Sequence, residues 1–314
     1  HTGNAKVTLH SPFWCNSPET VATQILAEEF TIDPGDISVD YADMDSGLDG
    51  TGPGGSRFTV MVSGAIQGAA SEIKEKMTEI AADMLEAGTD DVQLASGEFR
   101  VAGAPERSVG FADVALQAHA FELNLPEGMG SGLSADNTYD HPYTTMPEED
   151  RSDLGVFYPI MGHMCHACVV EVDAETGTVD FLDYVAVHDC GTVVNPKTLD
   201  GIIIGGTAQG IASVLYEEFD YDENGQLRTA NFTDYLVPTA HEMPDSIDIG
   251  HHETPSPWTE YGIKGAGEGG RMGAPPAVSR AIEDALSPFG IEVTELPLLP
   301  GRLQDEIRRA RQGS

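Results

Sequence analysis

The segment 261–270 constrains the fold most, because five glycines surround a single glutamate, Glu268. Glycine lets the backbone adopt positive φ and approach a ligand closely, so we expect a narrow site lined by main chain. Burial raises a carboxyl pKa toward the range that suits a general base, and a neighbouring lysine such as Lys264 has the opposite effect. The alternative is a glycine-rich surface loop with solvated charges, and this segment alone leaves both open.

The same segment matches the pattern G-x-G-x-x-G through Gly265, Gly267 and Gly270. A dinucleotide-binding loop of this kind requires a buried strand before the glycines and a helix that starts within them. The preceding residues 254–258 do not read as a strand, and the glycine and prolines of 273–276 are expected to delay the helix. A nicotinamide-dependent dehydrogenase is therefore the weaker interpretation.

Hydrophobic periodicity divides the chain into alternating strands and helices. A helix is expected to open at Ser17, as its N-cap, and Pro18. The other expected helices span 59–87, 109–118, 198–219, 275–286 and 303–311, and the expected strands span 6–10, 37–41, 92–94, 98–102, 168–173 and 179–187. The pattern predicts an α+β fold of two similar subdomains, 1–155 and 156–314. A long irregular segment at 122–153 closes the first, and such loops are usually functional or wrap another chain.

A second candidate site lies where a glycine-rich loop meets the helix expected at 59–87. Its residues are Gly54, Gly55, Ser56, Arg57 and Thr59. Backbone N–H groups, two hydroxyls and one guanidinium at a helix N-terminus predict an anion site. The P-loop lysine is missing, so a nucleoside triphosphate is not the expected ligand; an ordinary helix start is the alternative.

Glycines also interrupt the apolar helix expected at 198–219, in the run Gly-Gly-Thr-Ala-Gln-Gly (205–210). Such glycines permit close approach of another backbone or of a flat ligand. Gln209 would be a polar group among apolar neighbours and would need a partner. A helix–helix contact with a satisfied glutamine is the plainer interpretation.

Charge and cysteine content exclude several classes of function. The formal net charge is −36, which argues against binding a phosphate backbone, and no uninterrupted apolar run is long enough for a membrane span. The dispersed acid favours a cytoplasmic protein of a salt-adapted organism. Cys165 and Cys168 form a lone C-x-x-C pair, and with Cys15 and Cys190 elsewhere we expect buried thiols rather than a zinc site.

Taken in order, these segments resemble the molybdenum-cofactor domain of the xanthine oxidase family of molybdenum hydroxylases, which includes xanthine dehydrogenases, aldehyde oxidoreductases, carbon monoxide dehydrogenases and nicotinate dehydrogenases. The resemblance begins at the first helix and includes Gly-Pro-Gly-Gly-Ser-Arg (52–57), 171–177, Asp-Cys-Gly-Thr-Val-Val-Asn-Pro (189–196) and 205–210. It continues through Tyr-Leu-Val-Pro (235–238), 264–268 and 275–286. Each motif alone is weak, but their shared order covers nearly the whole chain.

The resemblance implies roles for the candidate residues. Glu268 would be the catalytic base in the hydroxylation, by water, of an aldehyde or of an N-heterocyclic or aromatic carbon. The loop Gly54, Gly55, Ser56, Arg57 and Thr59 would hold the pterin and phosphate of a molybdopterin cofactor, expected as its cytosine dinucleotide form. Gln209, Lys264 and Gly267 would line the pterin pocket, and no residue would bind the metal directly. Many members carry Gly-Gln-Gly before the first helix; here the aligned stretch is 14–17, and Asn16 would be a shorter substitute.

The resemblance also implies partners, because the chain is shorter than half a typical molybdenum subunit and lacks iron–sulfur cysteines and a flavin site. It would act with the N-terminal half of the molybdenum subunit, a [2Fe-2S] subunit and an FAD subunit, to which electrons from a small-molecule substrate would pass. The alternative is an assembly subunit that kept the fold and lost the cofactor, which only the departure at Asn16 supports.

Overall fold

The computed structural model describes residues 2–10, 16–43, 45, 50, 52–150, 152, 153, 155 and 160–313. Trp14 and Cys15, four residues of the glycine-rich stretch 47–51, and residue 156 at the expected subdomain boundary lie outside the described residues. The chain divides into two compact units. The first unit is His1–Ile160 with Pro257–Ile263, and the second unit is Met161–Ser256 with Lys264–Ser314. The segment Pro257–Ile263, expected in the second half, therefore belongs to the first unit.

The first unit combines two small sheets with three helices. Strands β1 (Ala5–Leu9) and β2 (Ile37–Tyr41) pair in parallel, joined by helix α1 (Pro18–Phe30). Helix α2 (Phe58–Met84) leads to an antiparallel sheet of β3 (Val92–Ala95), β4 (Glu98–Val101) and β5 (Ala104–Gly110), and α3 (Phe111–Ala120) follows. The rings of Phe30, Phe99 and Phe111 meet in its core, with Phe30 and Phe111 centroids 5.4 Å apart.

The irregular segment lies against its own unit. Apart from the 3₁₀ turn Glu122–Asn124, the described residues of 122–153 form no helix or strand. They lie along α2, where a Cβ on Gly64 would be 2.4 Å from the ring of Tyr139 and one on Gly68 would be 2.5 Å from the Asn137 amide. Glycines on α2 therefore make room for this segment.

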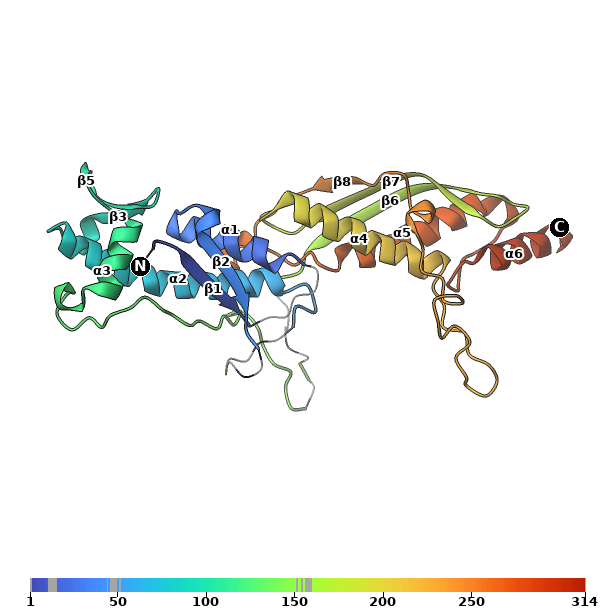
Figure 1. Cartoon of the computed structure of the whole chain (residues 1–314). Helices are drawn as coiled ribbons and strands as arrows, with labels where there is room; N and C mark the ends of the chain where they lie inside the picture. Colours follow the sequence, from blue (N-terminus) through green and yellow to red (C-terminus); the bar gives the residue numbers. More distant parts are fainter. Residues whose placement is uncertain are drawn as a thin grey trace. The chain divides into compact units, whose positions relative to one another are not determined.

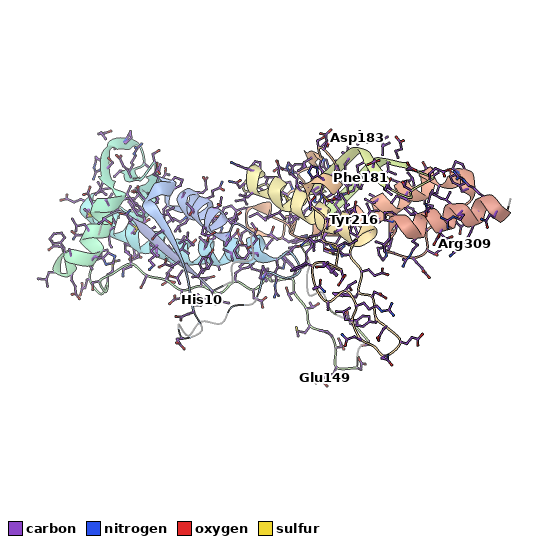
Figure 2. The ribbon with its side chains drawn as sticks, turned by 45° about the vertical axis from the view of Figure 1, so that its right-hand side comes forward. His10, Glu149, Phe181, Asp183, Tyr216 and Arg309 are labelled. Atoms are coloured by element: carbon purple, nitrogen blue, oxygen red, sulfur yellow. The ribbon has the colours of Figure 1, made fainter. Side chains whose placement is uncertain are left out.

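The second unit is one sheet covered by helices on one face. Strands β6 (His163–Val172) and β7 (Val179–Asp189) pair antiparallel, and β8 (Asp248–His251) pairs in parallel with β7. Helices α4 (Pro196–Leu215) and α5 (Gly269–Ala285) lie along the sheet, and α6 (Pro300–Gly313) follows at the C-terminal end (Figure 1). The pairing of β6 with β7 shifts register between Phe181 and Asp183, so Phe181 packs against the core whereas Asp183, two residues later, is exposed (Figure 2).

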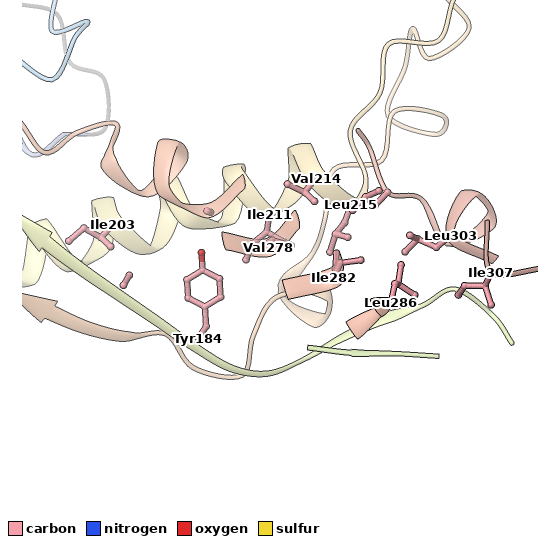
Figure 3. Packing of buried hydrophobic residues seen from close by; sticks show 13 residues of the cluster. Tyr184, Ile203, Ile211, Val214, Leu215, Val278, Ile282, Leu286, Leu303 and Ile307 are labelled. Atoms are coloured by element: carbon pink, nitrogen blue, oxygen red, sulfur yellow. The ribbon is translucent and has the colours of Figure 1, made fainter. Parts of the chain in front are cut away.

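The core of the second unit lies between the sheet and the helices. The ring of Tyr184 extends from β7 toward α4 and α5, into a cluster with Ile211 and Val278, while Leu303 and Ile307 of α6 close its far end (Figure 3). Short 3₁₀ turns complete the described chain at Pro34–Asp36, Thr89–Asp91, Ala240–Glu242, Glu260–Gly262 and Ser287–Phe289. Helices packed on small sheets confirm the expected α+β class.

Ser17 is the N-cap of α1 and Pro18 its first residue, as predicted, although the Ser17 backbone is left-handed (φ 54°) and its side chain makes no capping bond. Two local expectations are wrong. Residue 109 belongs to β5, so the next helix begins at Phe111. Helix α5 begins at Gly269, six residues before Pro275, and contains both prolines. Close packing on α4 extends it, since a Cβ on Gly270 would lie 2.4 Å from the Ile203 carbonyl oxygen.

Candidate functional site

Glu268 stands at the N-cap of α5, where its side chain is exposed. The helix axis starts immediately after it, and the Met272 N–H donates to the Glu268 carbonyl oxygen at 3.0 Å. An acidic side chain is favoured at a helix N-terminus, because the macrodipole presents partial positive charge there. The sequence predicted that Glu268 would be buried, but the described residues of this chain leave its side chain exposed.

Lys264, at the other end of the glycine-rich segment, makes a buried ion pair. Its Nζ lies 2.9 Å from Asp189 Oδ2 and 2.6 Å from Thr254 Oγ1, and the lysine and aspartate side chains are 12% and 10% exposed. The lysine charge is therefore matched within the second unit. Its ammonium group lies against Asp189, and the expectation that Lys264 lines a pterin pocket stays a prediction.

Asp189 accepts more hydrogen bonds than its ion pair with Lys264 alone. It also accepts from the backbone N–H groups of Gly191 at 2.9 Å and Thr254 at 3.3 Å, and from the Thr254 hydroxyl. Burial alone would raise the pKa of the Asp189 carboxyl, but the hydrogen bonds from Thr254, Gly191 and Lys264 outweigh burial and hold that pKa well below its usual range. Asp189 is thus a fixed anion at the end of β7.

The segment between Lys264 and Glu268 rests directly on the ends of β6 and β7. The Lys264 N–H donates to the Cys190 carbonyl oxygen at 2.7 Å. A Cβ on Gly162 would lie 2.1 Å from the Gly265 carbonyl oxygen, so a side chain at 162 would displace the segment. Gly267 is exposed beside Glu268. This main chain is held at close range by the ends of β6 and β7, and its approach to a ligand stays a prediction.

The glycines of α4 have two different surroundings. Cβ atoms on Gly206 and Gly210 would lie 3.0 Å from the Arg271 nitrogen and 2.6 Å from the Ala274 Cβ, so these glycines serve the α4–α5 contact. Gly205 has nothing within 4 Å, and Gln209, one turn later, is exposed. The helix–helix interpretation explains the first pair. Gly205 and Gln209 lie on a face that the described residues leave open.

The second predicted site, at the start of α2, has the backbone expected of an anion site. Gly55 (φ 80°) and Ser56 (φ 62°) are both left-handed, and Cβ positions on Gly54 and Gly55 meet no atom within 4 Å. Among the described residues no side chain caps α2 at Arg57, and its first turn contains no acid. Arg57 Nε donates to the Gly52 carbonyl oxygen at 3.1 Å, and Thr59 lies half-buried in the first turn.

The predicted residues therefore fall into two groups. Gln209, Lys264, Gly267 and Glu268 belong to the second unit, whereas the 54–59 loop and half-buried Asn16, two residues before α1, belong to the first. The fit of Asn16 to the stretch 14–17 stays a prediction, because Trp14 and Cys15 lie outside the described residues.

The C-x-x-C pair does not form a metal site. Positions three apart on β6 face opposite sides of the sheet, so Cys165 is exposed and Cys168 half-buried. The expectation of buried thiols in this pair is thus wrong for Cys165, and Cys168 is only half-buried. Among the described residues no group of three or more His, Cys, Asp or Glu side chains could hold a metal ion.

Sequence reasoning missed a chain of aromatic side chains under α5. His166 Nδ1 lies 3.0 Å from Tyr184 Oη, and His166 Nε2 lies 2.8 Å from His188 Nε2. Alternation on the two strands was the available signal, since it places all three residues on the helix-covered face. His166 was considered only with its neighbours along the chain.

Helix α4 is also, by length and composition, the one candidate membrane span in the described part of the chain. Its residues Ile203, Ile211 and Val214 are wholly buried against the sheet and α5. Buried core helices commonly meet the same criteria. The predicted absence of a membrane span stays a prediction.

Comparison with known proteins gives consistent matches. A family model described as the molybdopterin cofactor-binding domain matches residues 1–244. The nicotine 6-hydroxylase large subunit of Paenarthrobacter nicotinovorans is 36% identical over 312 residues, covering 99% of this chain and 36% of that protein. The carbon monoxide dehydrogenase large chain of Afipia carboxidovorans is 34% identical over 267 residues, covering 85% of this chain and 31% of that protein.

Solved structures agree with these sequence matches. Quinoline 2-oxidoreductase from Pseudomonas putida 86 superimposes with a TM-score of 0.86 at 36% identity, covering 98% of this chain and 37% of that chain. The present chain therefore spans about a third of the length of these relatives. The family model ends before the segment 264–268, which the longer sequence matches include.

Proposed function

The chain belongs to the molybdopterin cofactor-binding domain family, and on that premise we propose that it supplies the catalytic base and part of the cofactor cradle of a molybdenum hydroxylase. The reaction would add a hydroxyl group from water to an aldehyde or an electron-poor aromatic or N-heterocyclic carbon. It yields the hydroxylated product, two electrons and two protons. The relatives named for nicotine, carbon monoxide and quinoline support this class and leave the substrate of this chain open.

The residues present fit a pterin cofactor with a phosphate group. The start of α2 offers uncapped helix N–H groups, two left-handed residues and open space over Gly54 and Gly55, which suit an anion. Gly205 and Gln209 would offer a flat, open helix face to the pterin ring. The bound cofactor would supply the two-electron redox chemistry. We propose its cytosine dinucleotide form, as the resemblance implies.

Glu268 would accept the proton that water loses when its oxygen attacks the substrate carbon. A general base must hold a free lone pair near the reacting atom, and an ionised carboxylate does so. Its N-cap position places it at the positive end of the α5 dipole, and the main chain around it is held on β6 and β7. The observation that carries the proposal is this single exposed carboxylate on a glycine-lined, firmly anchored segment.

The chain would act with the rest of the molybdenum subunit, an iron–sulfur subunit and an FAD subunit, which would carry the electrons away. One face of the second unit supports such a contact, because its exposed residues are mainly apolar. The exposed apolar residues are Cys165, Ala167 and Val169 on β6 and Leu182 and Val187 on β7, and Glu171, Asp180 and Asp183 are the exposed acids on these two strands. On a chain of net charge −36, exposed apolar residues gathered on two neighbouring strands suit coverage by protein. We place the covering contact with the remainder of the molybdenum subunit and expect a cytoplasmic complex.

The experiment is Glu268→Gln in the assembled enzyme, with turnover measured on a panel of aldehydes and N-heterocycles and molybdenum measured by metal analysis. Losing the base should lower kcat by about 10²–10⁴-fold while molybdenum content stays unchanged. Glu292→Gln, at an exposed position outside any helix or strand, is the matched control and should retain activity. Turnover within about tenfold of wild type would remove the role proposed for Glu268.

The same experiment separates the alternatives. A complex that lacks molybdenum and turnover but assembles normally would indicate a non-catalytic assembly subunit. Nicotinamide binding by this chain would indicate a dehydrogenase built on Gly265, Gly267 and Gly270. Helix α5 does begin within these glycines, contrary to expectation, but the described residues 252–258 before them form no strand.

A further inference from the structure

A hydrogen-bonded row of three side chains, two of them buried and His166 half-buried, lies beneath the start of α5 and has no part in the mechanism above. Tyr184 and His188 come from β7 and His166 from β6, and Tyr184 and His188 are 0% and 2% exposed. The row runs from Tyr184 Oη to His166 Nδ1 at 3.0 Å, then from His166 Nε2 to His188 Nε2 at 2.8 Å. The row thus connects the core of the unit to the end of β7.

The direction of the hydrogen bonds follows from the donors available. Burial raises the pKa of the Tyr184 phenol, so it keeps its proton, and His166 is its one hydrogen-bond partner among the described residues. The phenol therefore donates to His166 Nδ1. A neutral imidazole that accepts at Nδ1 carries its proton on Nε2, so His166 donates to His188. His188 then carries its own proton on Nδ1.

Both histidines stay neutral near pH 7, as this arrangement requires. Burial lowers the pKa of His166. Burial, with smaller contributions from the charges of His166 and His251, lowers the pKa of His188 to about 4. Two protonated rings would direct N–H groups at each other across 2.8 Å, which the row cannot accommodate.

The two rings fill the space where α5 has no side chains. A Cβ on Gly269 would lie 2.6 Å from His188 Cε1 and 2.7 Å from its Nδ1, and a Cβ on Gly273 would lie 2.6 Å from His166 Cδ2. Gly269 directly follows Glu268. On the neighbouring position of β7, Asp189 holds Lys264 at 2.9 Å. Two consecutive residues of β7 therefore contact the two ends of this segment: Asp189 pairs with Lys264, and His188 packs under Gly269, the residue after Glu268.

We infer that His188 is a positioning residue for Glu268: the Tyr184–His166–His188 row locks its ring beneath Gly269 and so sets the first turn of α5. The inference rests on the proposed function of Glu268. The ring has no contact with substrate in this role. Its effect passes through the main chain at Gly269, so it acts on the orientation of the base rather than on substrate binding.

The test is a double-variant cycle in the assembled, molybdenum-loaded enzyme with Gly269→Ala, His188→Ala and both together. A methyl group at 269 meets the His188 ring, so Gly269→Ala should lower kcat by about 10²-fold, as expected for a base displaced by about 1 Å, with KM within about twofold. His188→Ala should lower kcat with the same unchanged KM. The double variant should lose no more than His188→Ala alone, and its Tm should exceed that of Gly269→Ala.

Gly301→Ala is the matched control, because a Cβ on this glycine of α6 meets no atom within 4 Å. Losses in kcat that multiply in the double variant would overturn the inference, as would a His188→Ala enzyme with wild-type kcat. If His188→Ala yields no loaded enzyme, Tyr184→Phe removes only the oxygen that orients His166, and an unchanged kcat there would also overturn it. Loss of activity in Glu268→Gln with no effect of these variants would leave the proposed function standing.

Discussion

The buried pair of Lys264 and Asp189 makes an asymmetric prediction about stability. In Asp189→Asn the lysine ammonium, 12% exposed, keeps only the Thr254 hydroxyl at 2.6 Å and becomes an uncompensated charge. Breaking a buried pair in this way costs about 3–5 kcal/mol. In Lys264→Met the aspartate keeps two backbone N–H donors and the Thr254 hydroxyl. We expect this second change to cost only about 1–3 kcal/mol, the range for a buried group that loses one hydrogen-bond partner.

The assay is calorimetric unfolding of the purified enzyme and of both variants. At about 2–4 °C per kcal/mol, a cost of about 3–5 kcal/mol means that Asp189→Asn should lower the Tm of the transition containing the second unit by roughly 6–20 °C at pH 7. Lys6→Met is the control, since the Lys6–Asp40 pair is 61% and 57% exposed and such pairs contribute about 0–1 kcal/mol. The reasoning is refuted if Lys264→Met destabilises the unit as much as Asp189→Asn.

The stability contributed by Asp189 also has a defined pH window. Its pKa in the folded chain lies below the unfolded value, so its contribution is present above the unfolded pKa and is lost as pH falls through the folded one. The difference in Tm between wild type and Asp189→Asn should therefore be full at pH 6–8 and shrink only in strong acid, below about pH 4.

Two further predictions concern packing and reactivity. Gly210→Ala, whose Cβ would lie 2.6 Å from Ala274 Cβ, should destabilise the second unit by about 1–3 kcal/mol, whereas Gly201→Ala, with nothing within 4 Å, should stabilise it by up to about 1 kcal/mol in urea unfolding. In the isolated chain, exposed Cys165 should react with iodoacetamide at pH 8 faster than Cys168 and Cys190, because burial raises the pKa of both of these thiols to about 11; equal rates by mass spectrometry would contradict this.

Local sequence signals located most helices and strands, because periodicity reports which face of an element is buried. Strand β2 was predicted at its observed bounds, Ile37–Tyr41, and α2 and α6 to within three residues at each end. Strand β8 was missed, since its four residues pair with β7 about 60 positions earlier and carry no alternation of their own. The prediction placed the start of α5 too late, because the rules for proline describe an isolated helix. Contact with α4 stabilises the helical turns before the prolines.

The candidate site divides in the same way. Sequence alone singled out Glu268, its glycines and the loop before α2, because glycines around a charged or helix-starting residue indicate close approach of the main chain. It assigned Lys264 to a ligand, and only the fold brings in Asp189, 75 positions away, as the partner of that charge.

Residue types and their spacing determined which side chains carry chemistry and which elements present them, since both depend on neighbours along the chain. Tertiary structure alone decided how each group is held: the ion pair beneath Lys264, the histidine rings beneath Gly269 and the early start of α5. These depend on contacts between strands and helices far apart in sequence. Close approach of two elements permits only glycine at some positions, a hydrogen bond between two rings fixes which nitrogen carries the proton, and an ion pair neutralises a buried charge.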